Sequence, residues 1–318
     1  MIAVIGAGAF GTALAVAFAS AGRPVTLWGR NAARMHAAEG SRTIDRLPDV
    51  TLPEAVTCTS ALADLAHAET ILLALPAQQT GGFLGDVAGK LPDVPLVLCA
   101  KGIDAPSLRL QTEIAGNAAP GHALAALTGP GFAGEIARGL PTALTLACAE
   151  AKRGATLQHL LSGPRLRLYL TDDVIGAQVG GALKNVIAIG CGIVEGARLG
   201  ASARAALMTR GFAEMSRLGV AIGARAETLA GLSGLGDLSL TCNSLQSRNF
   251  ARGVAIGKGA EIPQGTVEGV ATARAACRLA AHHGIEMPIA ASVADVLDGN
   301  LTLDAAMDAL LARPLKEE

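Results

Sequence analysis

Residues 1–11 read MIAVIGAGAFG, and this stretch decides the fold of the first half of the chain. An apolar strand runs into a G-x-G-x-x-G turn, which an Ala-rich helix and a second apolar strand at 25–28 follow. In such a unit Gly6 allows the tight turn, Gly8 lets the backbone approach a pyrophosphate, and Gly11 lets the helix press on the strand. The helix N-terminus offers free N–H groups to phosphates. The stretch therefore predicts a dinucleotide site; the alternative is a Gly-rich turn that binds nothing.

The same segment is uncharged over residues 1–22, which also resembles a signal peptide or a membrane span. A signal peptide carries a basic region before its apolar stretch, and none is present here. Closely spaced glycines fit a buried turn better than a lipid-facing helix. No other stretch offers about 18 uncharged apolar residues. We therefore expect a soluble, cytoplasmic protein without membrane insertion.

Length and composition set further limits. The chain has 318 residues, which predicts two domains, because single cores stop growing near about 250–300 residues. The net charge of −1 gives no bulk field that favours nucleic acid. Cysteines are scattered without C-x-x-C spacing, so we expect no metal site, no disulfide framework, and mostly buried thiols. They lie at positions 58, 99, 148, 191, 242 and 277.

The order of apolar segments predicts the architecture. Short strands alternate with helical stretches in the first half, which is typical of a parallel sheet with helical crossovers. We expect a helix near 32–39, a variable loop after it, and further strands at 70–75, 96–100, 123–127, 143–147 and 166–170. From Val174 onward the pattern is helical. The predicted fold is α/β: a Rossmann-type doubly wound parallel sheet domain over 1–172, followed by an all-α substrate domain over 173–318.

Cofactor selectivity depends on the end of the second strand. An NAD-selective site places an acid there for the ribose 2′-hydroxyl, whereas a nearby arginine accommodates a 2′-phosphate. This chain has Trp28-Gly-Arg30-Asn and no acid. We therefore expect NADP(H) to be accepted; the alternative is that Arg30 is a solvated surface residue.

A lysine lies in the middle of an apolar helical stretch, in Gly180-Gly181-Ala-Leu-Lys184-Asn. A charge in such a place is costly without a ligand or partner. The small residues one turn away leave room for something to approach the ammonium group closely, and such a lysine can give and take a proton. The alternative is a lysine that extends from a packed helix to solvent.

A Gly-rich loop begins at Gly231 and contains Asp237, which is a candidate to orient the lysine or to accept from a substrate hydroxyl. Hydroxyl, guanidinium and amide donors follow, as a phosphate site requires. They are Ser247, Arg248 and Asn249. The alternative is an ordinary Gly-rich connection. Glu268, which precedes a glycine, is weaker evidence for a functional site, because a lone glutamate before a glycine is usually a surface residue.

Taken together, these motifs resemble bacterial NAD(P)-dependent glycerol-3-phosphate dehydrogenases. The matching segments occur in the family's order and cover nearly the whole chain. They are Gly6–Gly11, Lys101–Ile103, Thr128–Ala133, Gly139–Thr142, Gly180–Ala188, Ala206–Gly211, Gly231–Thr241, Ser247–Asn249 and Val267–Gly269.

The resemblance implies a role for individual residues. Lys184 would be the proton donor and acceptor. The implied substrate-binding residues are Lys101, Gly129, Gly131, Lys184, Asp237, Ser247, Arg248 and Asn249. The implied residues for NADP(H) and/or NAD(H) are Gly6, Gly8, Ala9, Phe10, Gly11, Arg30, Lys101, Ala133, Arg248, Thr266 and Glu268. A homodimer is compatible with the sequence.

Three positions depart from the family's usual pattern. Ala9 replaces a Ser or Thr in the pyrophosphate turn, so one phosphate hydrogen bond must come from backbone or water. Gly131 replaces Ser, Thr or Asn, which removes a side chain that faces the substrate, and Ala77 replaces a common Ser. We expect weaker binding rather than another reaction.

The expected reaction is reversible reduction of dihydroxyacetone phosphate to sn-glycerol 3-phosphate, a precursor of glycerophospholipids. One alternative is a related two-domain NADP reductase of a ketopantoate- or 3-hydroxyacid-type substrate, which would need no phosphate cluster. Another is a non-enzymatic dinucleotide sensor, which would need no lysine in the apolar helix.

Overall fold

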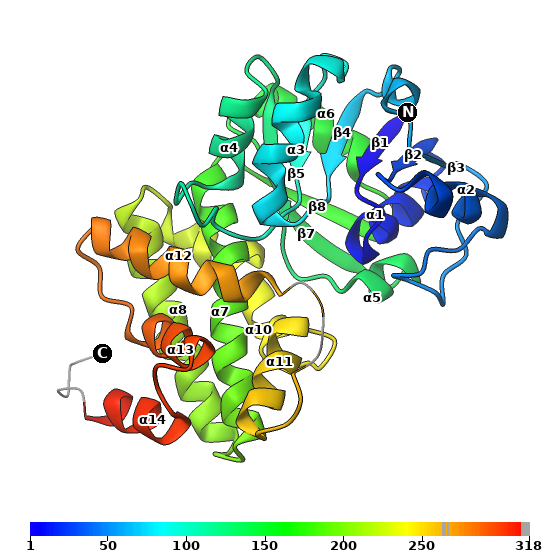
Figure 1. The fold of residues 1–318 in the computed structure, drawn as a ribbon. Coiled ribbons are helices and arrows are strands. Elements are labelled where there is room, and N and C mark those ends of the chain that lie inside the picture. The colour runs from blue at the N-terminus through cyan, green and yellow to red at the C-terminus, as the bar shows by residue number, and fades with distance from the viewer. Residues whose placement is uncertain (263–264, 266, 313–318) are drawn as a thin grey trace.

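The structure is a computed structural model that describes residues 1–262, 265 and 267–312. An α/β part carries the first half of the chain, and a helical part carries the second (Figure 1). The sheet has the order β3-β2-β1-β4-β5-β6-β7-β8. Its strands are β1 (Ile2–Ile5), β2 (Val25–Trp28), β3 (Val56–Thr59), β4 (Thr70–Leu73), β5 (Leu96–Leu98), β6 (Leu124–Thr128), β7 (Thr142–Ala147) and β8 (Leu166–Thr171).

This order confirms the doubly wound α/β fold, with β1 at the point where the winding reverses. β6 and β7 pair antiparallel, while all other described strand pairs are parallel. The predicted parallel sheet therefore contains one antiparallel pair. The variable loop also contains β3, an edge strand that the sequence did not predict.

Helices cover both faces of the sheet. One face packs on α1 (Ala9–Ser20), α2 (Ala32–Ser41) and α6 (Ala151–Leu161). The other packs on η1 (Leu62–Leu65), α3 (Thr80–Val87) and α4 (Gln111–Ala118). Shorter helices follow β4, α3 and β6: η2 (Ala77–Gln79), η3 (Ala88–Lys90) and α5 (Ala133–Ala137). Strands buried on both faces explain the continuous apolar runs in the sequence.

The helical part is built around α7 (Val174–Gly196), which packs on most of its other helices. These are α8 (Ala201–Ala221), α9 (Ala226–Ala230), η4 (Leu232–Gly236), α10 (Asp237–Thr241), α11 (Arg248–Gly257), α12 (Glu268–His282), α13 (Pro288–Asp298) and α14 (Leu303–Leu311). α7 is long and apolar enough to cross a membrane, but 89% of its apolar window is buried inside the protein. This burial is that of a core helix.

Glycines bring α7 and α11 into backbone contact. A Cβ on Gly192 would overlap the carbonyl oxygen of Phe250 and lie 2.9 Å from the Cα of Gly253. Gly196 and Gly257 meet in the same way one turn later, at 3.0 Å. Because small residues let helix backbones approach closely, α11 is held at a fixed position against the helix that carries Lys184.

We predict that Gly192→Ala destabilises the protein by about 1–3 kcal/mol or more, because backbone atoms of α11 would have to move. Gly85→Ala is the matched control, since Gly85 lies in α3 with nothing within 4 Å of its added Cβ. This change should stabilise by about 0.5–1 kcal/mol through helix propensity. Urea denaturation measures both; equal effects at the two sites would contradict the packing argument.

Candidate active site

The glycine turn between β1 and α1 has the geometry of a phosphate site. Gly6 adopts a φ of +116°, and a Cβ there would lie 2.5 Å from the carbonyl oxygen of Ala74. A Cβ on Gly11 would overlap the carbonyl oxygen of Gly6. Gly8 is the N-cap of α1 and has nothing within 4 Å of an added Cβ. The first turn of α1 holds no acid, so this open helix end fits the phosphates of a dinucleotide.

Two neighbours of this turn link it to other predicted residues. Ala9, at the start of α1, has no hydroxyl, so only its backbone is available to a phosphate. The Phe10 ring lies under the Lys101 ammonium, with Nζ 5.7 Å from the ring centroid. Arg30 follows β2 and is exposed, as a group that meets a ribose phosphate would be.

A buried cluster of two lysines and one carboxylate joins the two parts of the chain. Lys184 Nζ, on α7, donates to Asp237 Oδ1 at 2.7 Å and to Thr241 Oγ1 at 2.8 Å. Lys101 Nζ, after β5, donates to Asp237 Oδ2 at 2.7 Å and to the Gly129 carbonyl at 2.9 Å. Asp237 is only 1% exposed and Lys184 7%. The expectation that Asp237 orients Lys184 agrees with this geometry.

Each ammonium group retains one proton for a further acceptor. A lysine has three N–H donors. Lys184 and Lys101 each use two of theirs on acceptors in the described part of the chain. Two charged donors therefore remain beside the same carboxylate, and a substrate oxygen is the kind of group that would accept from them.

The cluster changes the acidity of its members. The pKa of Lys184 is lowered to about 8, mainly by burial and also by the charge of Lys101, against the charges of Asp237 and Glu268, which raise it. Burial by itself would raise the pKa of Asp237, but the charges of Lys101 and Lys184 outweigh it and hold that pKa below its usual value. A lysine with a pKa near neutral pH is suited to exchange a proton.

The two glycines before Lys184 admit protein rather than a ligand. A Cβ on Gly180 would lie 2.6 Å from the carbonyl oxygen of Ser233 and 2.8 Å from the Cα of Gly234. A Cβ on Gly181 would overlap the hydroxyl of Thr128. These glycines were expected to leave room for something to approach the ammonium group closely, and in the structure the backbone of η4 and the side chain of Thr128 take that room. The two glycines let η4 and β6 approach α7, and those elements lead to Asp237 and Gly129.

The predicted phosphate donors lie at the N-terminus of α11. Ser247 is the N-cap, and its Oγ accepts from the Phe250 N–H at 3.2 Å, which leaves its own hydroxyl proton free to donate. Arg248 is exposed at the first helical position. Asn249 donates to Asn185 Oδ1 at 2.8 Å and accepts from the Gly269 N–H at 3.1 Å. One amide proton of Asn249 remains for a ligand.

Glu268 also lies in this region, at the start of α12. Its Oε1 accepts from the backbone N–H of Ala77 at 3.1 Å, which connects the helical part to the turn after β4. Burial raises the pKa of Glu268, while the backbone N–H groups of Ala77 and Lys101 and the charges of Lys101 and Arg248 lower it. Thr266, which was expected to bind the cofactor, lies outside the described residues.

The turn after β6 holds the remaining predicted residues. Gly129 has a φ of +129°, and its carbonyl is the Lys101 acceptor described above. A Cβ on Gly131 would lie 3.0 Å from Ile136 Cδ1 and 3.2 Å from Thr142 Cγ2, so a larger residue would crowd this packed turn. Ala133 begins α5.

Two residues that contact the cluster were part of the predicted motifs but were not predicted individually. Thr241 lies one helical turn after Asp237, and this i,i+4 spacing was the available signal. Asn185 donates to the backbone carbonyl of Lys101 at 3.2 Å, which ties α7 to the Lys101 loop. Its position next to Lys184 was the only sequence cue.

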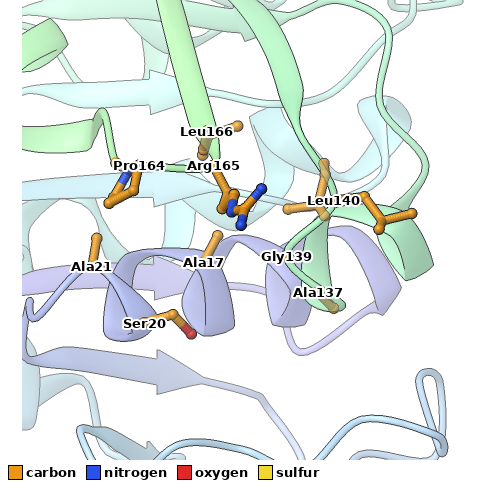
Figure 2. A pocket seen from close by; sticks show the side chains of 11 residues that line it. Ala17, Ser20, Ala21, Ala137, Gly139, Leu140, Pro164, Arg165 and Leu166 are labelled. Atoms are coloured by element: carbon orange, nitrogen blue, oxygen red, sulfur yellow. The ribbon is translucent and has the colours of Figure 1, made fainter.

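The pocket in Figure 2 lies elsewhere, between the end of α1, α5 and the turn before β8. Its lining is mostly apolar, with Arg165 as the ionisable residue among the side chains shown. None of the predicted site residues lines it. This pocket is therefore separate from the lysine–carboxylate cluster.

We predict that Asp237→Asn lowers the pKa of Lys184 below about 8, because the nearest opposite charge is lost while Lys101 remains. NMR of lysine labelled with ¹³C at Cε can follow this titration. Asp298→Asn is the control, since Asp298 pairs with Arg274 on the surface. An unchanged or higher pKa for Lys184 in Asp237→Asn would show that this pairing does not tune it.

Comparison with known proteins places the chain in a family. A model described as the NAD-dependent glycerol-3-phosphate dehydrogenase N-terminus matches residues 1–154, and the corresponding C-terminus model matches 173–308. The glycerol-3-phosphate dehydrogenase [NAD(P)+] of Paracoccus denitrificans is 55% identical over 318 residues, covering 100% of this chain and 99% of the relative. The relative from Cereibacter sphaeroides is 54% identical, with 100% of both chains covered.

Solved structures agree. The crystal structure of glycerol-3-phosphate dehydrogenase from Coxiella burnetii is 35% identical and superposes with a TM-score of 0.93, covering 98% of each chain. The enzyme from Saccharomyces cerevisiae, at 24% identity and a TM-score of 0.83, shares the fold. The chain belongs to the NAD-dependent glycerol-3-phosphate dehydrogenase family.

Proposed function

We propose that this chain reduces dihydroxyacetone phosphate to sn-glycerol 3-phosphate with NAD(P)H, reversibly. The observation that carries this proposal is the buried cluster in which Lys184 and Lys101 share Asp237, close to the nucleotide turn through Phe10. Relatives about half identical over their full length carry the name of this activity. A ketopantoate- or 3-hydroxyacid-type reductase would not need the α11 donors, and a non-enzymatic dinucleotide sensor would not need the buried lysines.

We propose that residues 1–172 form the dinucleotide-binding domain and residues 173–318 the substrate domain. β8 ends at Thr171 and α7 begins at Val174, which supports this boundary. The product of the proposed reaction is a glycerophospholipid precursor. We further propose that the enzyme is soluble and cytoplasmic and that it acts as a homodimer.

The residues divide the proposed chemistry between them. When bound at the Gly6–Gly11 turn, NAD(P)H supplies the hydride for the substrate carbonyl carbon. Lys184 Nζ gives its free proton to the substrate oxygen on which negative charge develops. Lys101 donates a charged hydrogen bond to the same region and stabilises that charge. The α11 N-terminus, with Arg248 and Asn249, holds the substrate phosphate.

The protonation state of Lys184 determines how the rates of reduction and oxidation depend on pH. Reduction needs the charged lysine, so kcat/KM for reduction is greatest well below the pKa of about 8 and declines as the pH rises through it. Oxidation needs the neutral amine, so its dependence on pH is the opposite.

We predict that Lys184→Met lowers kcat for reduction by about 10²–10⁴-fold, the usual contribution of a general acid. Binding of NADPH, followed by fluorescence titration, should be retained, because the nucleotide turn is on another part of the chain. The assay is NADPH oxidation with dihydroxyacetone phosphate, and with dihydroxyacetone, 2-ketopantoate and no substrate as comparisons. Near-normal turnover in the variant, or preference of the native enzyme for 2-ketopantoate, would refute the proposal.

We also predict that Arg30→Glu raises the KM for NADPH far more than the KM for NADH. The exposed guanidinium at the end of β2 would pair with the 2′-phosphate that only NADPH carries. Steady-state kinetics with each nucleotide measures the ratio. Arg34→Glu, on the next turn, is a matched surface control, and equal effects of Arg30→Glu on both nucleotides would remove Arg30 from the site.

A further inference from the structure

The loop that carries Lys101 is held by side-chain amides on three consecutive carbonyls. Asn185 Nδ2 donates to the carbonyl of Lys101 at 3.2 Å. Gln111 Nε2 donates to that of Gly102 at 3.0 Å, and Gln78 Nε2 to that of Ile103 at 2.8 Å. The three amides come from α7, α4 and η2. We call Asn185, Gln111 and Gln78 the amide clamp.

The clamped loop has little freedom on its other side. A Cβ on Gly102 would lie 2.8 Å from the Cβ of Ala77 and 3.2 Å from the hydroxyl of Thr272. Gly102 is therefore enclosed between η2 and α12. The orientation of its peptide groups depends on which carbonyls receive a donor, and Gln111 supplies the middle one.

Gln111 is the least expected member of the clamp. It is 1% exposed, and its Oε1 is buried without a hydrogen-bond partner in the described part of the chain. A buried unpaired acceptor is unfavourable for folding. An apolar side chain of similar size would avoid this cost, so the amide contributes at this position through its Nε2 bond to the loop.

We propose that Gln111 is a positioning residue that fixes the Lys101 ammonium through the carbonyl of Gly102. The inference rests on the proposed function, in which Lys101 gives its remaining proton to the substrate. Lys101 Nζ must reach Asp237 Oδ2 and the Gly129 carbonyl at once, at 2.7 and 2.9 Å. A loop that rotates at Gly102 moves the Lys101 side chain away from one or both acceptors.

The test replaces Gln111 with methionine, which keeps the length and removes the amide. We expect Gln111→Met to melt near the native temperature, because it loses one hydrogen bond and also one unpaired buried oxygen. We expect kcat/KM for dihydroxyacetone phosphate to fall about tenfold, a smaller loss than the roughly 10²-fold that a 1 Å misplacement can cause. Gln111→Asn, one methylene too short for Gly102, should reproduce the loss.

The pH profile separates positioning from general loosening. Displacement of Lys101 removes a repulsive charge from Lys184 and leaves Asp237 to pair with Lys184 alone. Both changes raise the midpoint of the alkaline decline in kcat/KM above about 8. Glu268 is the other charged group that acts on Lys184, and its carboxylate is also held by the backbone N–H of Ala77, outside the Lys101 loop.

Gln178→Met is the matched control. Gln178, on α7, is a buried amide that donates to Thr112 Oγ1 at 2.8 Å and accepts from the Thr112 N–H at 3.0 Å. Its loss loosens the start of α4, next to Gln111, without touching the clamped carbonyls. We expect Gln178→Met to lower the melting temperature and leave the midpoint in place.

Two results would overturn the inference. One is a native kcat/KM and midpoint in Gln111→Met; the other is an equal shift of the midpoint in Gln178→Met. Native enzyme that does not oxidise NADPH with dihydroxyacetone phosphate would instead refute the proposed function. In that case ¹³C NMR of Lys184 still tests the clamp, because its pKa should rise in Gln111→Met and a fixed pKa would reject the role.

Discussion

The site depends on one buried carboxylate that is shared by two lysines. Asp237 accepts from Lys184 of the helical part and from Lys101 of the sheet part. An isolated carboxylate in this position would lose several kcal/mol of hydration, so both ammonium groups are needed to keep it charged. Two positive charges against one negative leave a net charge of +1 in the cluster. In the proposed reaction this surplus is a fixed positive potential at the place where a substrate oxygen becomes negative.

Close backbone approach makes that geometry attainable. Lys184 is in the middle of a buried core helix, so Asp237 must come to it, and Gly180 allows η4 to pack directly on α7. η4 is a π-helix, a form that occurs frequently at functional sites. Gly181 gives Thr128 the same access, and the next residue, Gly129, provides the carbonyl that holds Lys101. The lysine–carboxylate pairs can therefore form only because the glycines on one face of α7 let η4 and β6 approach it closely.

The sequence predicted what local patterns encode and little of what distant contacts create. The turn at Gly6–Gly11, the apolar strands and the lysine in an apolar helix all follow from short-range spacing. The edge strand β3 and the antiparallel β6–β7 pair were missed, because edge position and strand direction depend on tertiary pairing. The role of Gln111 could not be predicted from the sequence for a similar reason. An isolated glutamine has no periodicity, and its partner at Gly102 is fixed only when α4 packs beneath the loop.

In the proposed reaction two lysines serve better than one, because only one of them loses a proton. Once Lys184 has given its proton to the substrate in that reaction, it is a neutral amine and no longer balances the charge of Asp237. Lys101 still donates to Asp237 Oδ2 at that stage, so the buried carboxylate keeps a charged partner throughout. With a single lysine, transfer would leave Asp237 unpaired in a dry site, at a cost of about 3–5 kcal/mol. That cost would oppose the transfer and hold the proton on the lysine. In the proposed reaction Gln111, which helps to fix Lys101 through the Gly102 carbonyl, therefore bears on proton transfer at Lys184.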